Sequence, residues 1–223
     1  MNCIARIPTP VLNTPDFHQV FTKLPLDDQG LLRALEMIAL PGTKFQILEK
    51  HPNDILEVKT EEYLCGPLYI DSRFTKPFAV ERKKVLPPAE VIRNRLINSL
   101  GLPYIWGGNW GKGIPEISSI YGAPKDLFSG VDCSGLLYEA TGGFTPRNTS
   151  DLMQFGEEVD DVKPLDILIW PGHVIIFLEK DLVIESLLGK GVITTLFEER
   201  RKEIPQNQYI IRRFIPPKTR NQH

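Results

Sequence analysis

The run His-Val-Ile-Ile-Phe-Leu at residues 173–178 constrains the fold of this chain more than any other segment. Apolar side chains occupy both faces of the strand that this run would form, and such a strand is buried on both sides. Four more strands are predicted around it: 165–170, 182–187, 192–197 and 208–214. His173 follows a Pro-Gly turn, so we expect its imidazole at the rim of the sheet, where clefts form.

The segment Gly-Val-Asp-Cys-Ser-Gly-Leu-Leu at 130–137 predicts a helix that begins beside a cysteine. Apolar or thiol side chains at 133, 136, 137 and 140 follow the spacing of one helix face, and Asp132 precedes them as an N-cap. A thiol in the first helical turn faces unpaired amides and the helix dipole, so we expect Cys133 to ionise more readily than a free cysteine. A cysteine that only fills the core has the same spacing, and that alternative remains open.

Glu185 lies in the apolar strand after His173, where a carboxylate is costly to bury without a partner. The imidazole is a suitable partner, because a carboxylate fixes the tautomer of a histidine that serves as a base. A two-residue turn at 180–181 would put the two side chains on opposite faces of the sheet. A three-residue loop at 179–181 pairs 178 with 182 and puts both on one face, so we predict that loop or a bulge.

The first part of the chain predicts a small β structure, because turn residues separate short apolar or alternating segments. The expected strands are 44–49, 55–60 and 63–71, the last divided into a short pair by Gly66-Pro67. Residues 1–26 contain several prolines and read as extended chain. Residues 29–39 fit a short helix, but residues 36–40 also fit a strand that enters the Pro41-Gly42 turn.

A linker, a helix and a long loop are expected next. Residues 76–88 combine proline with charge, and the basic run Arg82-Lys83-Lys84 within them reads as a solvated surface. A helix is predicted to start near Pro88 and to end at Gly101, with one apolar stripe made of Ala89, Ile92, Leu96 and Leu100. The loop at 109–129 is long, and we expect it to shape or cover a cleft.

Composition narrows the functional classes. The 223 residues carry a formal net charge of −2, which argues against nucleic acid or an anionic membrane as a partner. Cys3, Cys65 and Cys133 form no CxxC pair, so we expect neither a structural zinc site nor a disulfide framework. We find no signal-peptide pattern and no apolar window long enough to span a membrane, so a cytoplasmic location is expected, with signal-independent export to the cell envelope as the alternative.

The sequence resembles two known families in different parts of the chain. The segment PGTKFQILEKHPNDILEVKTEEYLCGPLYIDSRF resembles a bacterial SH3-like domain, and GLPYIWGG, DCSGLL, PGHVIIFL and VIES together resemble the NlpC-type cell-wall cysteine peptidases, a papain-like family. This resemblance implies an α+β fold, with helices packed on a central antiparallel sheet and a small SH3-like β-barrel before it. It divides the chain into 1–82, an SH3-like domain with an extended N-terminal segment, and 83–223, an NlpC-type papain-like catalytic domain.

The resemblance also assigns catalytic residues. The catalytic cysteine of the family falls on Cys133, and its histidine falls on His173. Its third polar residue, commonly His, Asn or Gln, falls on Glu185, and the tyrosine of its oxyanion site falls on Tyr104. These assignments imply acyl transfer to water through a Cys-His-Glu triad and a thioester intermediate, with no metal and no organic cofactor.

Substrate contacts are expected from four further residues. By the same resemblance, Asp132 and Ser134 would hold the free amine of the substrate, although both also suit the start of a helix. Trp106 and Ser150, in neighbouring segments, are expected to contact substrate as well. The implied substrates are peptidoglycan stem peptides or muropeptides, cut most often between γ-D-glutamate and a diamino acid. Two alternatives stay open: another papain-like acyltransferase, and a non-catalytic cell-wall-binding module.

Overall fold

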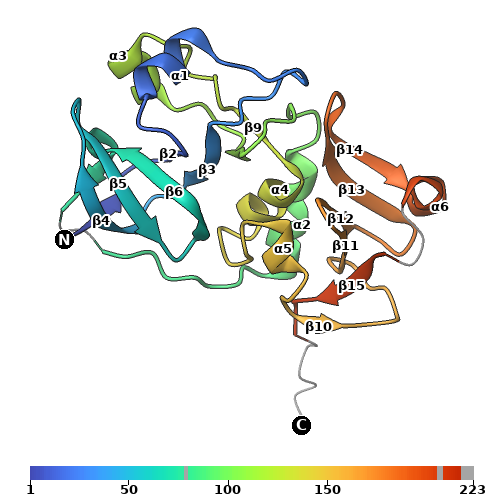
Figure 1. Ribbon diagram of the computed structural model, residues 1–223. Helices are drawn as coiled ribbons and strands as arrows, with labels where there is room; N and C mark the ends of the chain where they lie inside the picture. The colour runs from blue at the N-terminus through green and yellow to red at the C-terminus, as the bar shows by residue number, and fades with distance from the viewer. Residues whose placement is uncertain (78–79, 205–207, 217–223) are drawn as a thin grey trace.

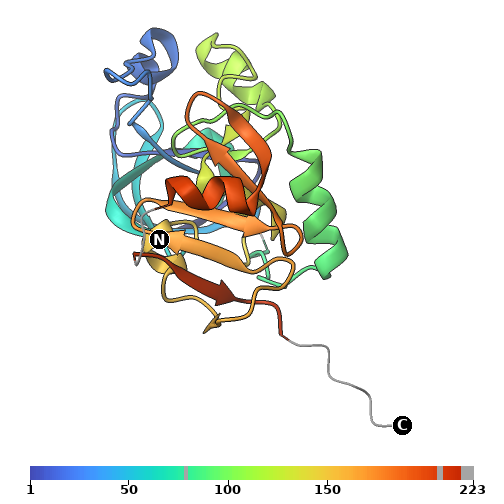
Figure 2. The ribbon, with the colours of Figure 1, turned by 90° about the vertical axis from the view of Figure 1, so that its right-hand side faces the viewer.

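The structure, a computed structural model, describes residues 1–77, 80–204 and 208–216. It is an α+β fold in which two large antiparallel sheets lie side by side, with helices between them (Figures 1 and 2). The helices are α1 (Phe17–Lys23), α2 (Ala89–Asn98), α3 (Pro115–Tyr121), α4 (Cys133–Ala140), α5 (Thr149–Leu152) and α6 (Phe197–Arg200), with short 3-10 turns at Ser72–Phe74 and Arg201–Glu203. No helix in these described ranges is long and apolar enough to cross a membrane.

The N-terminal sheet is curled and has seven strands in the order β3-β2-β6-β5-β4-β1-β7 (Figure 1). Its strands are β1 (Asn2–Ala5), β2 (Thr9–Leu12), β3 (Leu35–Ala39), β4 (Lys44–Lys50), β5 (Ile55–Thr60), β6 (Tyr63–Asp71) and β7 (Thr75–Lys76). Phe45, Val58 and Ile70 from three of these strands pack with Tyr138 of α4 in one buried cluster. The N-terminal sheet therefore shares a core with the helix that begins at Cys133.

Two expectations for this part of the chain are corrected, and one open alternative is decided. Residues 63–71 form the single strand β6, in which Gly66 has a left-handed φ of 63° where the pairing with β5 is irregular. Residues 1–26 contain the helix α1 besides two strands, since Phe17, Val20 and Phe21 give it a buried face. Of the two alternatives for residues 29–39, the strand is the one observed, as β3 at Leu35–Ala39.

The C-terminal sheet has six strands in the order β10-β15-β11-β12-β13-β14. These strands are β10 (Glu157–Glu158), β11 (Ile167–Trp170), β12 (His173–Phe177), β13 (Leu182–Leu187), β14 (Gly191–Leu196) and β15 (Ile210–Arg213). Val174 and Ile176 of β12 pack on the α4 side, whereas Ile175 and Phe177 pack on the side covered by Phe197 of α6. The prediction of a central strand buried on both faces is thus confirmed.

The hairpin between β12 and β13 has the predicted register. Ile176 pairs with Ile184 and Phe177 with Val183, and the Leu178 N–H donates to the Leu182 carbonyl at 2.9 Å. Residues 179–181 therefore form the three-residue loop. Because side chains alternate along each strand, this register puts positions 173 and 185 on one face of the sheet.

The helix after the linker is shorter than expected and has a narrower apolar stripe. Ile92 and Leu96 are fully buried in α2, but Ala89 is exposed and Leu100 lies beyond the end of the helix, also exposed. Two buried positions one turn apart are enough to dock α2 on α4, since Ile92 and Leu96 share one core cluster with Leu136.

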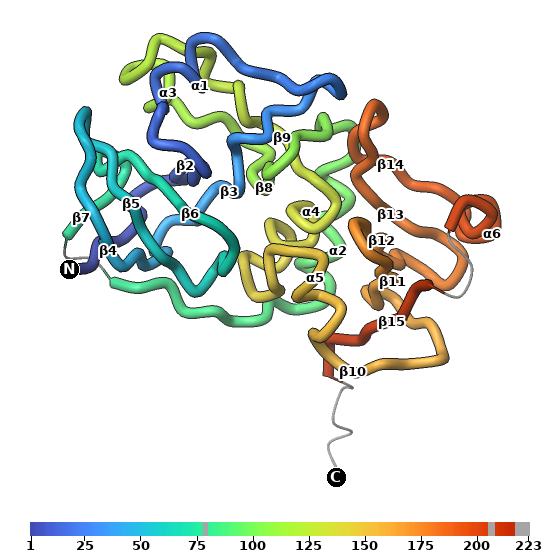
Figure 3. Tube along the Cα trace, viewed as in Figure 1, coloured from blue at the N-terminus to red at the C-terminus, as the bar shows by residue number. Residues whose placement is uncertain are grey.

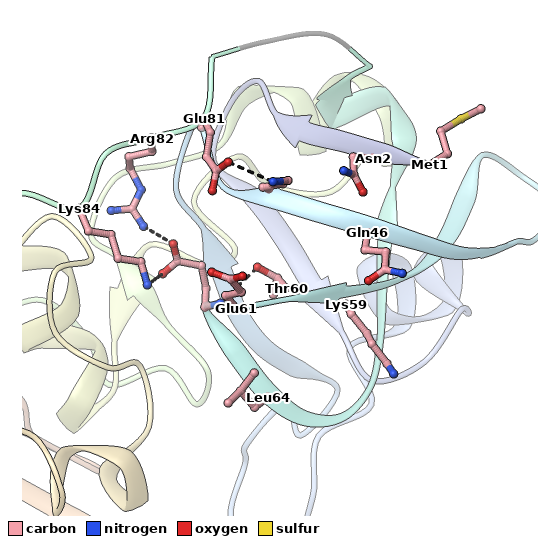
Figure 4. A pocket seen from close by; sticks show the side chains of 13 residues that line it. Met1, Asn2, Gln46, Lys59, Thr60, Glu61, Leu64, Glu81, Arg82 and Lys84 are labelled. Atoms are coloured by element: carbon pink, nitrogen blue, oxygen red, sulfur yellow. Dashed lines mark hydrogen bonds and ion pairs between the residues drawn. The ribbon is translucent and has the colours of Figure 1, made fainter.

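The basic run in the linker is solvated at Lys83 and Lys84, as expected, but not at Arg82. The Arg82 guanidinium donates to the Glu62 carboxylate at 2.6 Å and to the Gly142 carbonyl at 2.6 Å, while Lys84 pairs with Glu62 at 3.1 Å. The linker runs beside the N-terminal sheet (Figure 3), and at residues 81–84 it borders a groove of about 680 Å³ (Figure 4). Arg82 thus fastens the linker to both halves of the molecule.

The insertion at 109–129 contains structure and packs on the N-terminal half. It holds β8 (Asn109–Trp110), which pairs with β9 (Gly130–Val131), and it holds α3. Tyr121 of α3 stacks on Phe21 of α1 with ring centroids 4.3 Å apart. At its start, the Asn109 side chain accepts from the Ile38 N–H at 2.9 Å and donates to the Ile38 carbonyl at 2.7 Å. The insertion therefore contributes to the N-terminal core.

Candidate active site

Cys133 occupies the first position of α4, where the sequence predicts it. The Asp132 side chain accepts from the Gly135 N–H at 2.6 Å, so Asp132 is the N-cap. Gly135 is required here because a Cβ at this position would lie 1.9 Å from the Gly108 carbonyl oxygen. The Cys133 thiol is 6% exposed, and its Sγ lies 3.9 Å from the Gly172 carbonyl oxygen, in the turn just before His173.

The expectation of an easily ionised thiol is wrong for this structure. Burial, followed by the charge of the adjacent Asp132 carboxylate, raises the pKa of Cys133 to about 12. Arg147 and the backbone amides of Ser134 and Val174 act in the opposite direction but do not outweigh burial. The dipole at the start of a short helix is worth less than the cost of a thiolate out of water, so Cys133 needs a base to lose its proton.

His173 and Glu185 form a hydrogen-bonded pair on the outer face of β12 and β13. The His173 Nε2 lies 2.7 Å from Glu185 Oε2, and the Glu185 carboxylate is buried. The Trp170 ring packs beside the imidazole with centroids 4.9 Å apart. Because Nε2 is engaged by the carboxylate, Nδ1 is the ring nitrogen left to exchange protons with another group.

Cys133 and His173 approach each other at the rim of the sheet from different sides. Cys133 packs in the cluster of Val174 and Ile176, on the α4 face, whereas His173 shares its face with Ile175. Among the residues that the structure describes, no hydrogen bond joins the Cys133 thiol to the imidazole; the thiol contacts the backbone at Gly172 instead. The structure therefore brings together the imidazole and the carboxylate, and it places the sulfur beside the backbone of the same turn.

Arg200 is part of this site and was not predicted from the sequence. Its Nε donates to Glu185 Oε1 at 2.6 Å, and its Nη2 donates to Glu185 Oε2 at 3.0 Å. Burial alone would raise the pKa of Glu185, but the hydrogen bonds from His173 and Arg200 lower it. Glu185 is therefore held as a carboxylate between a guanidinium and an imidazole.

Arg147 is the second functional residue that the sequence analysis missed. Its guanidinium is 2% exposed and donates to both oxygens of Asp132, at 2.6 and 3.0 Å. It also donates to the Ser134 hydroxyl at 3.0 Å, and Gly107 N–H donates to Asp132 at 3.1 Å. Asp132 and Ser134, which are predicted to hold a substrate amine, are both buried and bonded within the protein. These hydrogen bonds fix the start of α4.

The remaining predicted residues lie at different depths. Tyr104 is half-buried, and burial, followed by the charges of Asp132 and Cys133, raises the pKa of its phenol, so the hydroxyl is protonated near the thiol. Trp106 is 37% exposed and lies under the Arg33 guanidinium, 4.0 Å from the ring centroid. Ser150 is exposed on α5.

A group that could hold a divalent cation lies outside this site. Within the described part of the chain, ligand atoms of Glu49, His51 and Glu57 lie within 4.8 Å of one another. All three belong to the β4–β5 hairpin of the N-terminal sheet. Carboxylate and imidazole ligands suit several divalent metals, but none of these side chains contacts His173 or Cys133.

Comparisons with known proteins find similarity at the level of structure only. No protein-family model matches the chain, and no curated protein sequence matches it. The peptidoglycan hydrolase RipB of Mycobacterium tuberculosis is 22% identical, with a TM-score of 0.43 over 58% of this chain and 65% of that one. An NlpC/P60 family protein of Bacillus cereus is 18% identical, with a TM-score of 0.45 over 96% and 63% of the two chains. NlpC2 of Trichomonas vaginalis is 15% identical, with a TM-score of 0.43 over 97% and 74%. The chain spans less than two thirds of the length of the first two.

Proposed function

We propose that this protein is a cysteine peptidase that hydrolyses peptide amide bonds through Cys133, His173 and Glu185. The observation that supports this proposal most is the His173–Glu185 hydrogen bond of 2.7 Å at the rim of the sheet, beside the buried start of α4. A carboxylate that fixes the tautomer of an imidazole near a thiol is the arrangement of a nucleophile, a base and an orienting group.

The reaction begins with proton transfer from Cys133 to His173. Since Glu185 engages Nε2, the acceptor is Nδ1, and the thiol turns from the Gly172 carbonyl toward the imidazole when substrate binds. Catalytic hydrogen bonds are often long in free enzymes and tighten in the complex. The thiolate then attacks the amide carbonyl, His173 returns the proton to the leaving amine, and water hydrolyses the thioester.

The oxyanion of the tetrahedral intermediate needs hydrogen-bond donors close to the sulfur. The Cys133 backbone N–H is one candidate, because an amide in the first turn of a helix has no partner within that helix. The Tyr104 hydroxyl is the other, and its raised pKa keeps it a donor at neutral pH. Such donors are worth about 3 kcal/mol each in comparable enzymes, so Tyr104→Phe should reduce turnover much less than Cys133→Ala.

The proposed substrates are peptidoglycan stem peptides, cut between γ-D-glutamate and a diamino acid. This choice rests on the resemblance of the DCSGLL and PGHVIIFL motifs to NlpC-type peptidases. The separate resemblance of the segment PGTKFQILEKHPNDILEVKTEEYLCGPLYIDSRF supports an SH3-like identity for the curled N-terminal sheet and a division of the chain at residue 82. A cytoplasmic location stays a prediction.

The test is incubation of the full chain with L-Ala-γ-D-Glu-diaminopimelate peptides and longer stem peptides, followed by mass spectrometry. Wild-type protein should release the diamino acid fragment, and Cys133→Ala and His173→Ala should not. A product that carries an added amine or acyl acceptor in place of water would indicate an acyltransferase. Intact peptides after prolonged incubation with folded wild-type protein would contradict the proposal and favour a binding module.

A further inference from the structure

We infer that Arg200 is a positioning residue of the active site, which holds Glu185 so that one carboxylate oxygen is presented to His173 Nε2. This inference rests on the function proposed above and adds a fourth member to the site. Arg200 contacts neither the sulfur nor the free ring nitrogen, and it acts through Glu185.

The geometry of the pair leaves the carboxylate in a single orientation. The Arg200 Nε and Nη2 donate to separate oxygens of Glu185, at 2.6 and 3.0 Å, in the forked arrangement that matches a planar carboxylate. Oε2 receives the His173 Nε2 as well, at 2.7 Å. Any rotation of the carboxylate would break at least one bond of the fork, so Arg200 restricts where the imidazole can bind.

The electrostatic contribution of Arg200 follows from burial. Glu185 is 1% exposed, and a buried carboxylate without a positive partner takes up a proton. A protonated Glu185 could donate to the imidazole instead of accepting from it, and the tautomer would no longer be fixed. Arg200 keeps Glu185 an acceptor, which selects the Nε2–H tautomer and leaves Nδ1 free to take the thiol proton.

Arg200 is itself held in place from two sides. Its Nη1 donates to Glu203 Oε2 at 2.9 Å, and its guanidinium lies 5.6 Å from the Trp170 ring centroid. The same Trp170 ring packs on His173. The arginine, the tryptophan and the histidine thus form one contiguous layer over Glu185 on the α6 side of the sheet.

The charged groups around Glu185 are few. On β12 it faces His173, and from the segment after β14 it faces Arg200, which is paired in turn with Glu203. Across the rim of the sheet, the N-cap Asp132 of α4 is paired with Arg147. A pH effect of substitution at Arg200 therefore acts on Glu185 and on the imidazole bonded to it.

The experiment compares Arg200→Met and Arg200→Lys with a matched control on the same sheet. Arg213→Met is that control, because Arg213 donates to the buried Asp166 at 2.9 and 2.7 Å but lies on β15, away from the imidazole. Both substitutions to Met remove a forked ion pair, so both lower stability. Only the Arg200 variants should change the chemistry.

The expected result for Arg200→Met is a fall in kcat of about 10- to 100-fold, as found for residues that orient catalytic ligands. The acid limb of its pH–rate profile should shift to higher pH, because the pKa of Glu185 rises when its partner is removed. Arg200→Lys should recover part of the rate, and Arg213→Met should keep the wild-type pH profile. Equal kcat losses in Arg200→Met and Arg213→Met, with unchanged pH profiles, would overturn the inference.

A second readout is independent of hydrolysis. In folded Cys133→Ala protein, the nitrogen NMR shifts of His173 report which ring nitrogen carries the proton. We expect the Nε2–H tautomer alone, and a mixture of tautomers when Arg200→Met is added. If wild-type protein cleaves no peptide, the proposed function fails while this readout still tests Arg200. An unchanged tautomer in the double variant would overturn the inference even in an active peptidase.

Discussion

Two buried arginine–carboxylate pairs, one at the start of α4 and one on the α6 side of the C-terminal sheet, differ in the other hydrogen bonds that their carboxylates accept. In Arg147–Asp132, on the helix side, both carboxylate oxygens also accept backbone N–H bonds, from Gly107 and Gly135. In Arg200–Glu185, on the sheet side, one oxygen accepts from His173. The first pair is closed within the protein, whereas the second serves an ionisable ring. Similar chemistry thus supports the fold in one place and a reactive group in the other.

The largest expected effect concerns the thiol beside the closed pair. Because burial and Asp132 raise the pKa of Cys133 to about 12, little thiolate exists at pH 7.5. Iodoacetamide should label Cys133 on the order of a thousandfold more slowly than a free cysteine, and the exposed Cys65 should be labelled first. Peptide mass spectrometry over time measures both rates. Preferential labelling of Cys133 at neutral pH in substrate-free protein would show that the thiol is ionised in spite of burial.

Arg147→Met should break the Arg147–Asp132 pair and lower the free energy of unfolding of the protein. It leaves the Asp132 carboxylate buried without its guanidinium, which typically costs about 3–5 kcal/mol. Urea denaturation, monitored by fluorescence, gives the free energy of unfolding. The double variant Arg147→Met/Asp132→Asn is the control, and it should recover part of the loss because no charge remains unpaired. A single variant within about 0.5 kcal/mol of wild type would refute the structural role of this pair.

Glu185→Gln, in the Arg200–Glu185 pair, should lower the free energy of unfolding less, by about 1–3 kcal/mol. The reason is that the amide still accepts one hydrogen bond from Arg200. Since the folded-state pKa of Glu185 is lowered, its ionic contribution is present above the unfolded pKa of about 4.3 and is lost as the pH falls through the folded value. The difference in unfolding free energy between wild type and variant should therefore be largest near pH 7 and shrink below about pH 4. A difference that grows as the pH falls would contradict an ionised Glu185.

Glu203→Gln should have the smallest effect. Glu203 bonds to the outer nitrogen of Arg200, but its side chain is 69% exposed, and exposed ion pairs contribute about 0–1 kcal/mol. Thermal denaturation should shift only slightly, and kcat should stay near the wild-type value. A loss of activity as large as that of Arg200→Met would mean that the orientation of Arg200 depends on Glu203 more than on Glu185.

Local rules predicted the parts of the site that neighbouring residues determine. Asp132 caps α4 because a short acceptor before an apolar run binds the free amides of the first turn. The contact between His173 and Glu185 follows from the side-chain period of two and from the loop at 179–181. Each of these features depends on fewer than about fifteen consecutive residues, so the sequence alone was sufficient.

The two arginines could not be found in this way, because neither belongs to the strand or helix that carries its partner, although each lies only 15 residues from it. Arg200 lies in the run Glu-Glu-Arg-Arg-Lys-Glu, which reads as a solvated surface, and only the turn after β14 folds it over Glu185. Arg147 follows a Thr-Pro pair in an irregular segment. A buried carboxylate requires a partner, and that requirement was the signal available: Asp132 and Glu185 each needed a cation that the sequence did not identify.

The paired side chain of Asn109 has a consequence for how the protein can be divided. Its amide imitates the backbone of a strand and completes the hydrogen bonding of Ile38 across the interface between the halves. A polypeptide made of residues 83–223 alone would carry this fully buried amide, together with Ile117 and Phe128, to its surface. Such a fragment should self-associate or misfold, so we expect the two halves to fold as one cooperative unit and to need expression as one polypeptide.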